Sequence, residues 1–217
     1  HNTVLGPIVR ERLLRGDISG AVQEFRKLAE QYKHTPLQFE LLSLLVRLSN
    51  HHAEETAKYP NCSVETAQNL LSELTEIISK VHGVVNMNSA LLLAFAESGN
   101  DNQLRKLLIN PEFRINHELL LKNCEHLGEG GAIATLLRLA RCSRGLANVI
   151  EEQSIYNMLL ENFKKSNNCA AALDLFARLE MDDELKISAE FLRNLVQLLK
   201  ANNEEIPSNI ALRAQII

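Results

Sequence analysis

The sequence has no tryptophan, and aromatic residues make up only 5% of its 217 residues. Its four cysteines are scattered without the paired spacing of a disulfide framework, which predicts a reducing compartment. No apolar run reaches the ~18 residues of a membrane-spanning helix, so we expect no membrane partner. The chain shows no signal or transit sequence and begins without methionine, and we interpret it as the C-terminal fragment of a longer protein.

An excess of basic residues is also missing. The formal net charge is -4 and the pI is about 6.0. Contacts to phosphates dominate nucleic-acid affinity, and domains dedicated to such binding usually carry a basic excess. The balance therefore argues against tight, autonomous RNA binding by this chain, although a local basic stripe is compatible with it.

Patterns that carry catalysis are absent from the sequence. It contains no nucleophile elbow, no His-Glu-x-x-His motif and no spaced pair of catalytic carboxylates. The pattern places two acidic clusters, Glu151-Glu152 and Asp182-Asp183-Glu184, at helix starts, where carboxylates complement the helix dipole. We expect a protein that is not an enzyme and that has no small-molecule substrate.

Cofactor and metal sites are not expected either. His51-His52 and Cys124-x-His126 are the only metal-like pairs, and structural zinc needs four ligands at defined spacing. The segment 128–131 (Gly-Glu-Gly-Gly) lacks the preceding strand of a phosphate-binding loop. We predict a hairpin turn there.

Leucine is abundant and β-branched residues never alternate with polar ones, which predicts an all-α fold. Apolar residues recur at helical spacing in successive segments. The expected helices are 8–15, 18–33, 37–52, 64–82, 86–98, 100–109, 116–127, 132–141, 154–165, 169–179 and 187–200, with a short connector at 146–150.

The segment 154–179 contains two such helices around the polar break Ser166-Asn167-Asn168, where a turn is favoured. It predicts an αα-hairpin with one apolar stripe on each helix. One hairpin cannot bury both stripes, so it needs neighbours of the same kind. We predict a single domain over 1–217, an α-solenoid of about five helical hairpins closed by a terminal capping helix at 187–200.

Two segments fall outside the hairpin pattern. Residues 53–61 are polar and are interpreted as a loop insertion within a hairpin. Residues 206–217 are interpreted as a tail that is ordered only if it docks. The helix at 37–52 is apolar around most of its circumference, and two interpretations stay open. It is either sandwiched within the array or partly exposed for a partner.

The hairpin at 154–179 resembles one repeat of the pentatricopeptide-repeat family. The residues that carry the resemblance are Tyr156, Asn157, Leu159, Leu160, Phe163 and Lys165 in the first helix, and Ala172, Leu173, Leu175, Phe176 and Leu179 in the second. The chain is similar to the C-terminal part of the leucine-rich members of this family in animal mitochondria. The resemblance implies binding of single-stranded RNA, with a role in mitochondrial mRNA stability and translation control. It implies a location in the mitochondrial matrix, with the cytoplasm and nucleus as further locations.

The family reads each base with a pair of residues, one near the start of the first helix of a repeat and one at the end of the repeat. By resemblance, Asn157 matches the first of these positions, and Arg193 is the nearest match in the last helix. The alternative is that Asn157 only solvates or caps its helix. Arg138, Arg141 and Arg144 recur every three residues and could follow a phosphate backbone. Cations at a helix C-terminus also favour the dipole without any ligand.

A second basic candidate lies near the N-terminus, with the same two interpretations; it comprises Arg10, Arg12, Arg15, Arg26 and Lys27. The alternative function for the whole chain is a protein–protein interaction module with little direct RNA contact. Negative charge and irregular repeats favour that alternative, and a protein partner is expected in either case.

Overall fold

The structure, a computed structural model, describes residues 2–124, 128–146, 150–183 and 185–215. Every regular element within these residues is an α-helix, which confirms the predicted all-α class. The helices are α1 (Asn2–Leu14), α2 (Ile18–Tyr32), α3 (Gln38–Ser49), α4 (Ala53–Lys58), α5 (Val64–His82), α6 (Val84–Ser98), α7 (Asp101–Ile109), α8 (His117–Cys124), α9 (Gly128–Ser143), α10 (Glu152–Lys165), α11 (Cys169–Glu180), α12 (Ala189–Ala201) and α13 (Ser208–Gln215).

Contacts within the chain define two compact units, His1–Asn123 and Cys124–Ile217. The predicted first, second, third and fifth hairpins form within the units as α1–α2, α3–α5, α6–α7 and α10–α11, and the continuous array over residues 1–217 stays a prediction. The two helices of the predicted fourth hairpin exist as α8 and α9. The predicted helix end at Leu127 and residues 147–149 of the predicted connector lie outside the described part of the chain.

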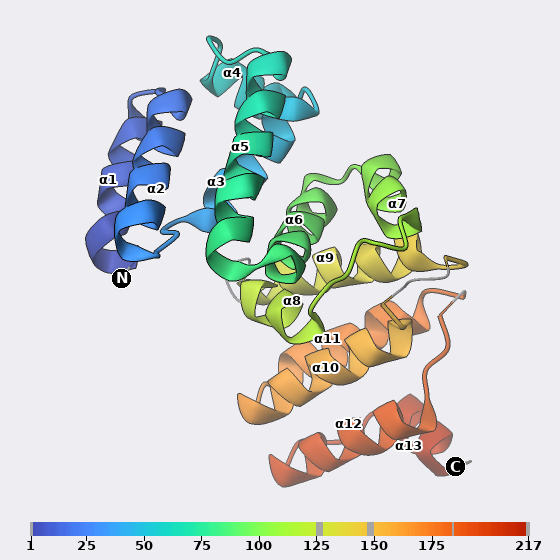
Figure 1. The fold of residues 1–217 in the computed structure, drawn as a ribbon. Coiled ribbons are helices and arrows are strands. Elements are labelled where there is room, and N and C mark those ends of the chain that lie inside the picture. The colour runs from blue at the N-terminus through green and yellow to red at the C-terminus, as the bar shows by residue number, and fades with distance from the viewer. Residues whose placement is uncertain (1, 125–127, 147–149, 184, 216–217) are drawn as a thin grey trace. The chain divides into compact units, whose positions relative to one another are not determined.

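In the first unit, α1 pairs with α2, α3 pairs with α5, and α6 pairs with α7 (Figure 1). Helix α2 also packs on α5, and α6 packs on both α3 and α5, so each hairpin lies against the next. Short polar residues start these helices, since Asp17 accepts a 2.8 Å hydrogen bond from the backbone N–H of Gly20 and Asn100 accepts one of 3.1 Å from that of Gln103.

Helix α3 lies in the middle of the first unit. Leu41, Leu42, Leu45 and Val46 are fully buried, and α5 and α6 both pack against the helix. An all-round apolar helix is stable when neighbours cover more than one of its faces. Of the two interpretations of this segment, the structure supports the sandwiched one.

In the second unit, α9 packs against α10 and α11, and α10 also packs against α12. Helix α12 then pairs with α13 (Figure 1). The hairpins thus share their apolar faces in succession, as the repeat pattern predicts.

Residues 206–217 were interpreted as a tail that is ordered only if it docks, and the structure shows it docked through the helix α13 over Ser208–Gln215. The side chain of Ile210 is completely buried, and Glu180 on α11 accepts a 3.0 Å hydrogen bond from Asn209 and pairs with Arg213 at 3.1 Å. The helix at 187–200 is therefore followed by a partner. Docking of Ile210 orders a segment too short to form a stable helix alone.

The insertion 53–61 is not a plain loop, because it contains the short helix α4. Glu55 of α4 pairs with Arg47 of α3 at 3.0 Å, and the side chain of Tyr59 is only 6% exposed. These two contacts attach the insertion to the unit.

Two helix starts also differ from the sequence prediction. Gly128–Gly131 was expected to form a turn and instead begins α9. Glycine in a helix costs about 1 kcal/mol relative to alanine, and the burial of Ile133 and Leu136 further along α9 offsets this. Helix α1 begins at Asn2 rather than Ile8 and continues through Pro7, with Gly6 next to the side chain of Leu37. No helix within the described residues is long and apolar enough to cross a membrane.

We predict that Leu45→Ala lowers the free energy of unfolding by about 2–5 kcal/mol, because it leaves a cavity among well-packed helices. Leu45 is completely buried, whereas the Leu14 side chain is 80% exposed and provides a matched control. Leu14→Ala should change stability by less than about 0.5 kcal/mol. Urea unfolding followed by circular dichroism measures both, and equal losses would contradict the packing described for α3.

Candidate nucleic-acid interface

The hairpin α10–α11 carries Asn157. On α10, Ile155, Tyr156, Leu159, Leu160 and Phe163 are buried and face the unit's interior. The turn uses both asparagines of the predicted break: Asn167 adopts a left-handed φ of 52°, and the Asn168 side chain accepts a 3.0 Å hydrogen bond from the N–H of Ala171. Asparagine tolerates both roles, so the local structure follows from the sequence.

Helix α12 repeats the arrangement of α10. The buried pair Ile155-Tyr156 precedes Asn157, and the buried pair Phe191-Leu192 precedes Arg193. Asn157 and Arg193 therefore occupy equivalent positions on consecutive first helices of their hairpins. Since α10 packs against α12, the structure places the two predicted base-reading positions on neighbouring helices.

Asn157 and Arg193 differ in their surroundings. Asn157 is half-buried, and its Oδ1 accepts a 3.2 Å hydrogen bond from Nε2 of Gln153 one turn earlier. That bond involves the oxygen of the Asn157 carboxamide, and the two N–H donors of the same group take no part in it. Arg193 is exposed. Base contact by either residue stays a prediction, and the partial burial of Asn157 also fits the interpretation of a helix-solvating side chain.

The three arginines expected to form a phosphate track have different environments. Arg141 is exposed and Arg138 is half-buried on α9. Arg144 lies just beyond α9, where it pairs with Glu152 at 2.8 Å and with Asp182 at 3.3 Å. Two carboxylates already neutralise the Arg144 charge, which disfavours a phosphate contact at this residue. The function of all three as RNA contacts stays a prediction.

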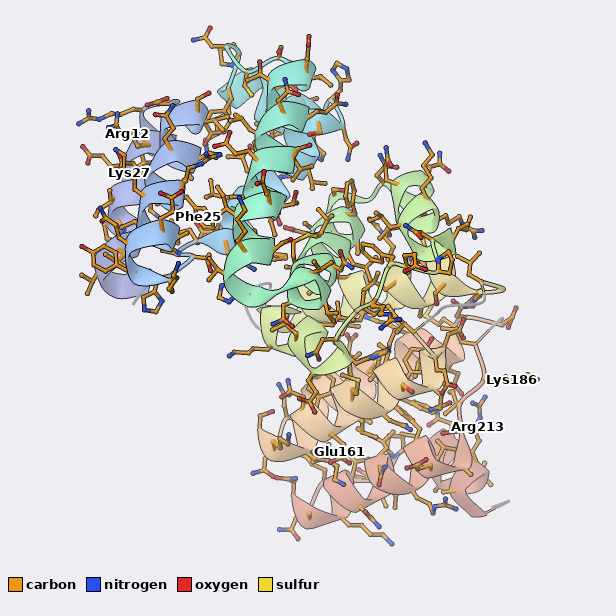
Figure 2. The ribbon with its side chains drawn as sticks, in the orientation of Figure 1. Arg12, Phe25, Lys27, Glu161, Lys186 and Arg213 are labelled. Carbon is orange, nitrogen blue, oxygen red and sulfur yellow. The ribbon has the colours of Figure 1, made fainter. Side chains whose placement is uncertain are left out.

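The N-terminal basic candidate is extensively paired. Arg10 pairs with Glu40 at 2.9 Å, Arg26 with Glu73 at 2.6 Å, and Arg15 with Glu11. Arg12 and Lys27, labelled on α1 and α2 in Figure 2, share the carboxylate of Glu24. Each cation has a carboxylate partner within the unit, so this patch offers little excess positive charge.

A partly buried polar network was not anticipated from the sequence. Both of its acids were interpreted as helix-start residues: Glu152 is in the first turn of α10 as predicted, whereas Asp182 lies in the connection after α11. Arg144 connects the two, although they are far apart in sequence. Only the position of Arg144 three residues after Arg141 marked it as notable. Its partners could not be found from spacing, because ion pairs between different helices follow no sequence period.

Tyr156 lies beside this network. Its side chain is 1% exposed, and its hydroxyl group has no hydrogen-bond partner. Burial raises the pKa of the Tyr156 phenol well above its usual value, the charge of Glu152 raises it further, and Arg144 opposes the shift. Burying a hydroxyl without a partner costs free energy.

Among the described residues, no group of three or more His, Cys, Asp and Glu side chains is arranged to hold a metal ion. Burial raises the pKa of the Cys169 thiol, and Cys142 is also buried, which fits their interpretation as small apolar core residues.

Comparison with known proteins connects the chain to one kind of protein. It is 23% identical over 204 residues to the "Leucine-rich PPR motif-containing protein, mitochondrial" of Mus musculus. It is 24% identical over the same length to the protein of that name from Rattus norvegicus. Each alignment covers 94% of this chain but only 13% of the relative. The resemblance noted in the sequence is thus confirmed over nearly the whole chain. No protein-family model matches it, and no solved structure matches it significantly.

We predict that Tyr156→Phe raises the free energy of unfolding by about 1 kcal/mol, because it removes a buried hydroxyl without a partner. Tyr32→Phe is the control, since the Tyr32 side chain is 57% exposed. Urea unfolding at neutral pH compares the two variants. A destabilised Tyr156→Phe protein would show that the hydroxyl has a stabilising partner in solution.

The same variant tests the pKa of Tyr156. Its folded pKa is raised. The stability linked to this shift is therefore complete below the unfolded pKa of about 10 and is lost as pH rises above it. The wild-type protein should lose more stability than Tyr156→Phe between about pH 9 and pH 11. Parallel losses in the two proteins would contradict the shift.

Proposed function

We propose that this chain is a C-terminal segment of a mitochondrial RNA-binding helical-repeat protein, acting in mRNA stability and translation control. The observation that carries the proposal is the similarity to two mitochondrial leucine-rich PPR motif-containing proteins along 94% of the chain. The chain spans about 13% of the length of these relatives, so it supplies one part of the proposed activity. Single-stranded RNA, in particular mRNA, is the proposed ligand.

The arrangement of α10 and α12 supports a mechanism of base contact. Stacked helical repeats can present one nucleotide to each repeat, read by two or three side chains. Asn157 and Arg193 hold equivalent positions on these neighbouring helices. The carboxamide of Asn157 can donate to and accept from a base edge, and the guanidinium of Arg193 can donate to or stack on a base.

Phosphate contacts in this proposal come from Arg138 and Arg141 on α9. The net charge of -4 and the carboxylate partners of other cations limit the electrostatic contribution. Because counterion release supplies much of nucleic-acid affinity, binding by this segment alone is expected to be weak and sensitive to salt.

The paired cations also support a second candidate function, a protein–protein interaction module with little RNA contact. Helix α1 adds exposed apolar side chains, with Val4 at 72% and Leu14 at 80% exposure. The apolar helix α3 gives no support here, because its leucines are buried within the first unit. The RNA and protein functions are compatible in one longer chain.

We predict that the 217-residue chain binds a mixed-sequence single-stranded RNA at about 0.1 M salt, with an affinity that falls as salt rises. Replacing Arg138 and Arg141 by alanine should flatten the slope of log K against log salt by up to about 1.4, at ~0.7 for each phosphate contact on a single strand. Fluorescence anisotropy measures the slope, and an unchanged slope would reject both arginines.

Two further variants separate base contact from phosphate contact. Asn157→Ala should alter the preference among homopolymer RNAs while leaving the salt slope unchanged, because a neutral side chain releases no counterions. Arg178→Ala is the matched control for the loss of an arginine at Arg138 or Arg141. Arg178 pairs with Asp174 of its own helix α11 and is not a proposed phosphate contact. Absence of binding at any salt concentration would leave the protein-interaction function as the surviving candidate.

A further inference from the structure

The guanidinium of Arg144, a residue of the predicted phosphate track, connects three separate segments. It follows α9, its Nε donates a 2.8 Å hydrogen bond to Glu152 at the start of α10, and its Nη2 donates one of 3.3 Å to Asp182 between α11 and α12. The two bonds use different nitrogens of one planar group. An ammonium group cannot reproduce this fork, so the arrangement is specific for arginine.

Partial burial strengthens these bonds. The Arg144 side chain is 23% exposed, and those of Glu152 and Asp182 are 26% and 28% exposed. By contrast, Arg178 and Asp174 are 43% and 51% exposed and join residues of a single helix. An exposed pair within one helix contributes little, whereas breaking a less exposed pair leaves carboxylates without their counter-charge.

The first unit contains a similar arrangement. Arg47 of α3 pairs with Glu55 of α4 at 3.0 Å and with Glu97 of α6 at 3.4 Å, and its side chain is also 23% exposed. An arginine that connects carboxylates of two other elements therefore occurs in both units. This recurrence points to a structural role for the motif rather than to a ligand contact.

Other contacts also hold the end of α9, next to Arg144, against the start of α10. The hydroxyl of the buried Ser143 lies 2.8 Å from the carbonyl oxygen of Ala140 and 3.3 Å from that of Ile150, and its one O–H can donate to either. The end of α9 therefore lies close to the start of α10. The buried Tyr156 ring lies one turn after Glu152 and directly before Asn157. Movement at Arg144 would therefore be transmitted to the Asn157 position.

Asp182 lies in the connection between the end of α11 and the start of α12. The segment after it leads to Ser188, whose side chain accepts a 3.1 Å hydrogen bond from the N–H of Phe191 and thereby starts the helix that carries Arg193. One guanidinium thus contacts the residue that begins α10 and the connection that leads into α12.

We infer that Arg144 is a positioning residue that sets the spacing between Asn157 on α10 and Arg193 on α12, and does not itself contact RNA. The effect of Arg144 on RNA binding rests on the proposed function. The structural content of the inference, the spacing of the two helices, is independent of any ligand.

Spin labels test the spacing directly. Glu161→Cys and Gln197→Cys place labels at exposed, equivalent positions on α10 and α12, in a background where Cys62 and Cys124 are serine. Pulsed electron–electron double resonance measures the distribution of distances between the two labels. This distribution should be broader after Arg144→Gln and partly recover its original width with Arg144→Lys. It should not change after Arg178→Gln, the control. An unchanged distribution in Arg144→Gln overturns the inference.

Asp182→Asn provides a milder variant if Arg144→Gln fails to fold, as judged by circular dichroism. It removes one of the two charge pairs and keeps the size of the side chain. The inference predicts that it also broadens the distribution, and an unchanged distribution in a folded Asp182→Asn protein counts against it.

RNA binding separates positioning from contact. Arg144→Gln should weaken the affinity for single-stranded RNA by about three- to tenfold, a typical effect of a residue that acts through others. The salt slope should stay the same, whereas loss of a phosphate contact would lower it by ~0.7. A lowered slope with an unchanged label distance would assign Arg144 to RNA. If the wild-type chain binds no RNA, the proposed function fails, and the label distances still decide the positioning role.

Discussion

Burial of apolar helix faces between neighbouring hairpins is the interaction on which this structure depends. A single hairpin leaves one face of each helix exposed, and the next hairpin covers it. In the first unit, Leu42 and Leu45 of α3 are completely buried by helices on more than one side. In the second unit, α10 is covered in the same way by α9, α11 and α12. The hydrophobic effect is non-directional, so it drives this stacking without defining the spacing of polar side chains on the surface.

Directional contacts supply that spacing. Arg144 and Arg47 each bind two carboxylates from other elements, and these bonds hold particular residues of neighbouring helices at defined positions. The unpartnered hydroxyl of Tyr156 lies beside the Arg144 network and weakens the same region. A protein that presents side chains to an extended ligand needs its neighbouring helices at fixed relative positions. Ion pairs such as those of Arg144 and Arg47 meet that need at a modest cost in stability.

The sequence predicted the local features correctly where the causes were local. Asn167 and Asn168 form the turn and cap of α11 as expected, and α5 begins and ends at the predicted residues Val64 and His82. Prediction was wrong where packing opposed local preference. Gly128–Gly131 is helical where a turn was expected. The tail is ordered as α13 with Ile210 buried, which agrees with the expectation that docking orders it. The equivalence of Asn157 and Arg193 was partly visible, because each follows a pair of residues that the helical period places inside.

By itself, the amino-acid sequence determined the helical class, the hairpin pattern and most helix boundaries, because apolar period, caps and turn residues act over a few positions. It also carried the resemblance that the comparisons with the mouse and rat proteins support. Only the tertiary structure decided which charges are available. Arg144 and the N-terminal arginines look alike in sequence to Arg141, yet they have carboxylate partners up to 47 residues away. Side chains meet across helices through packing, and the distance between them in space is not encoded by their separation along the chain.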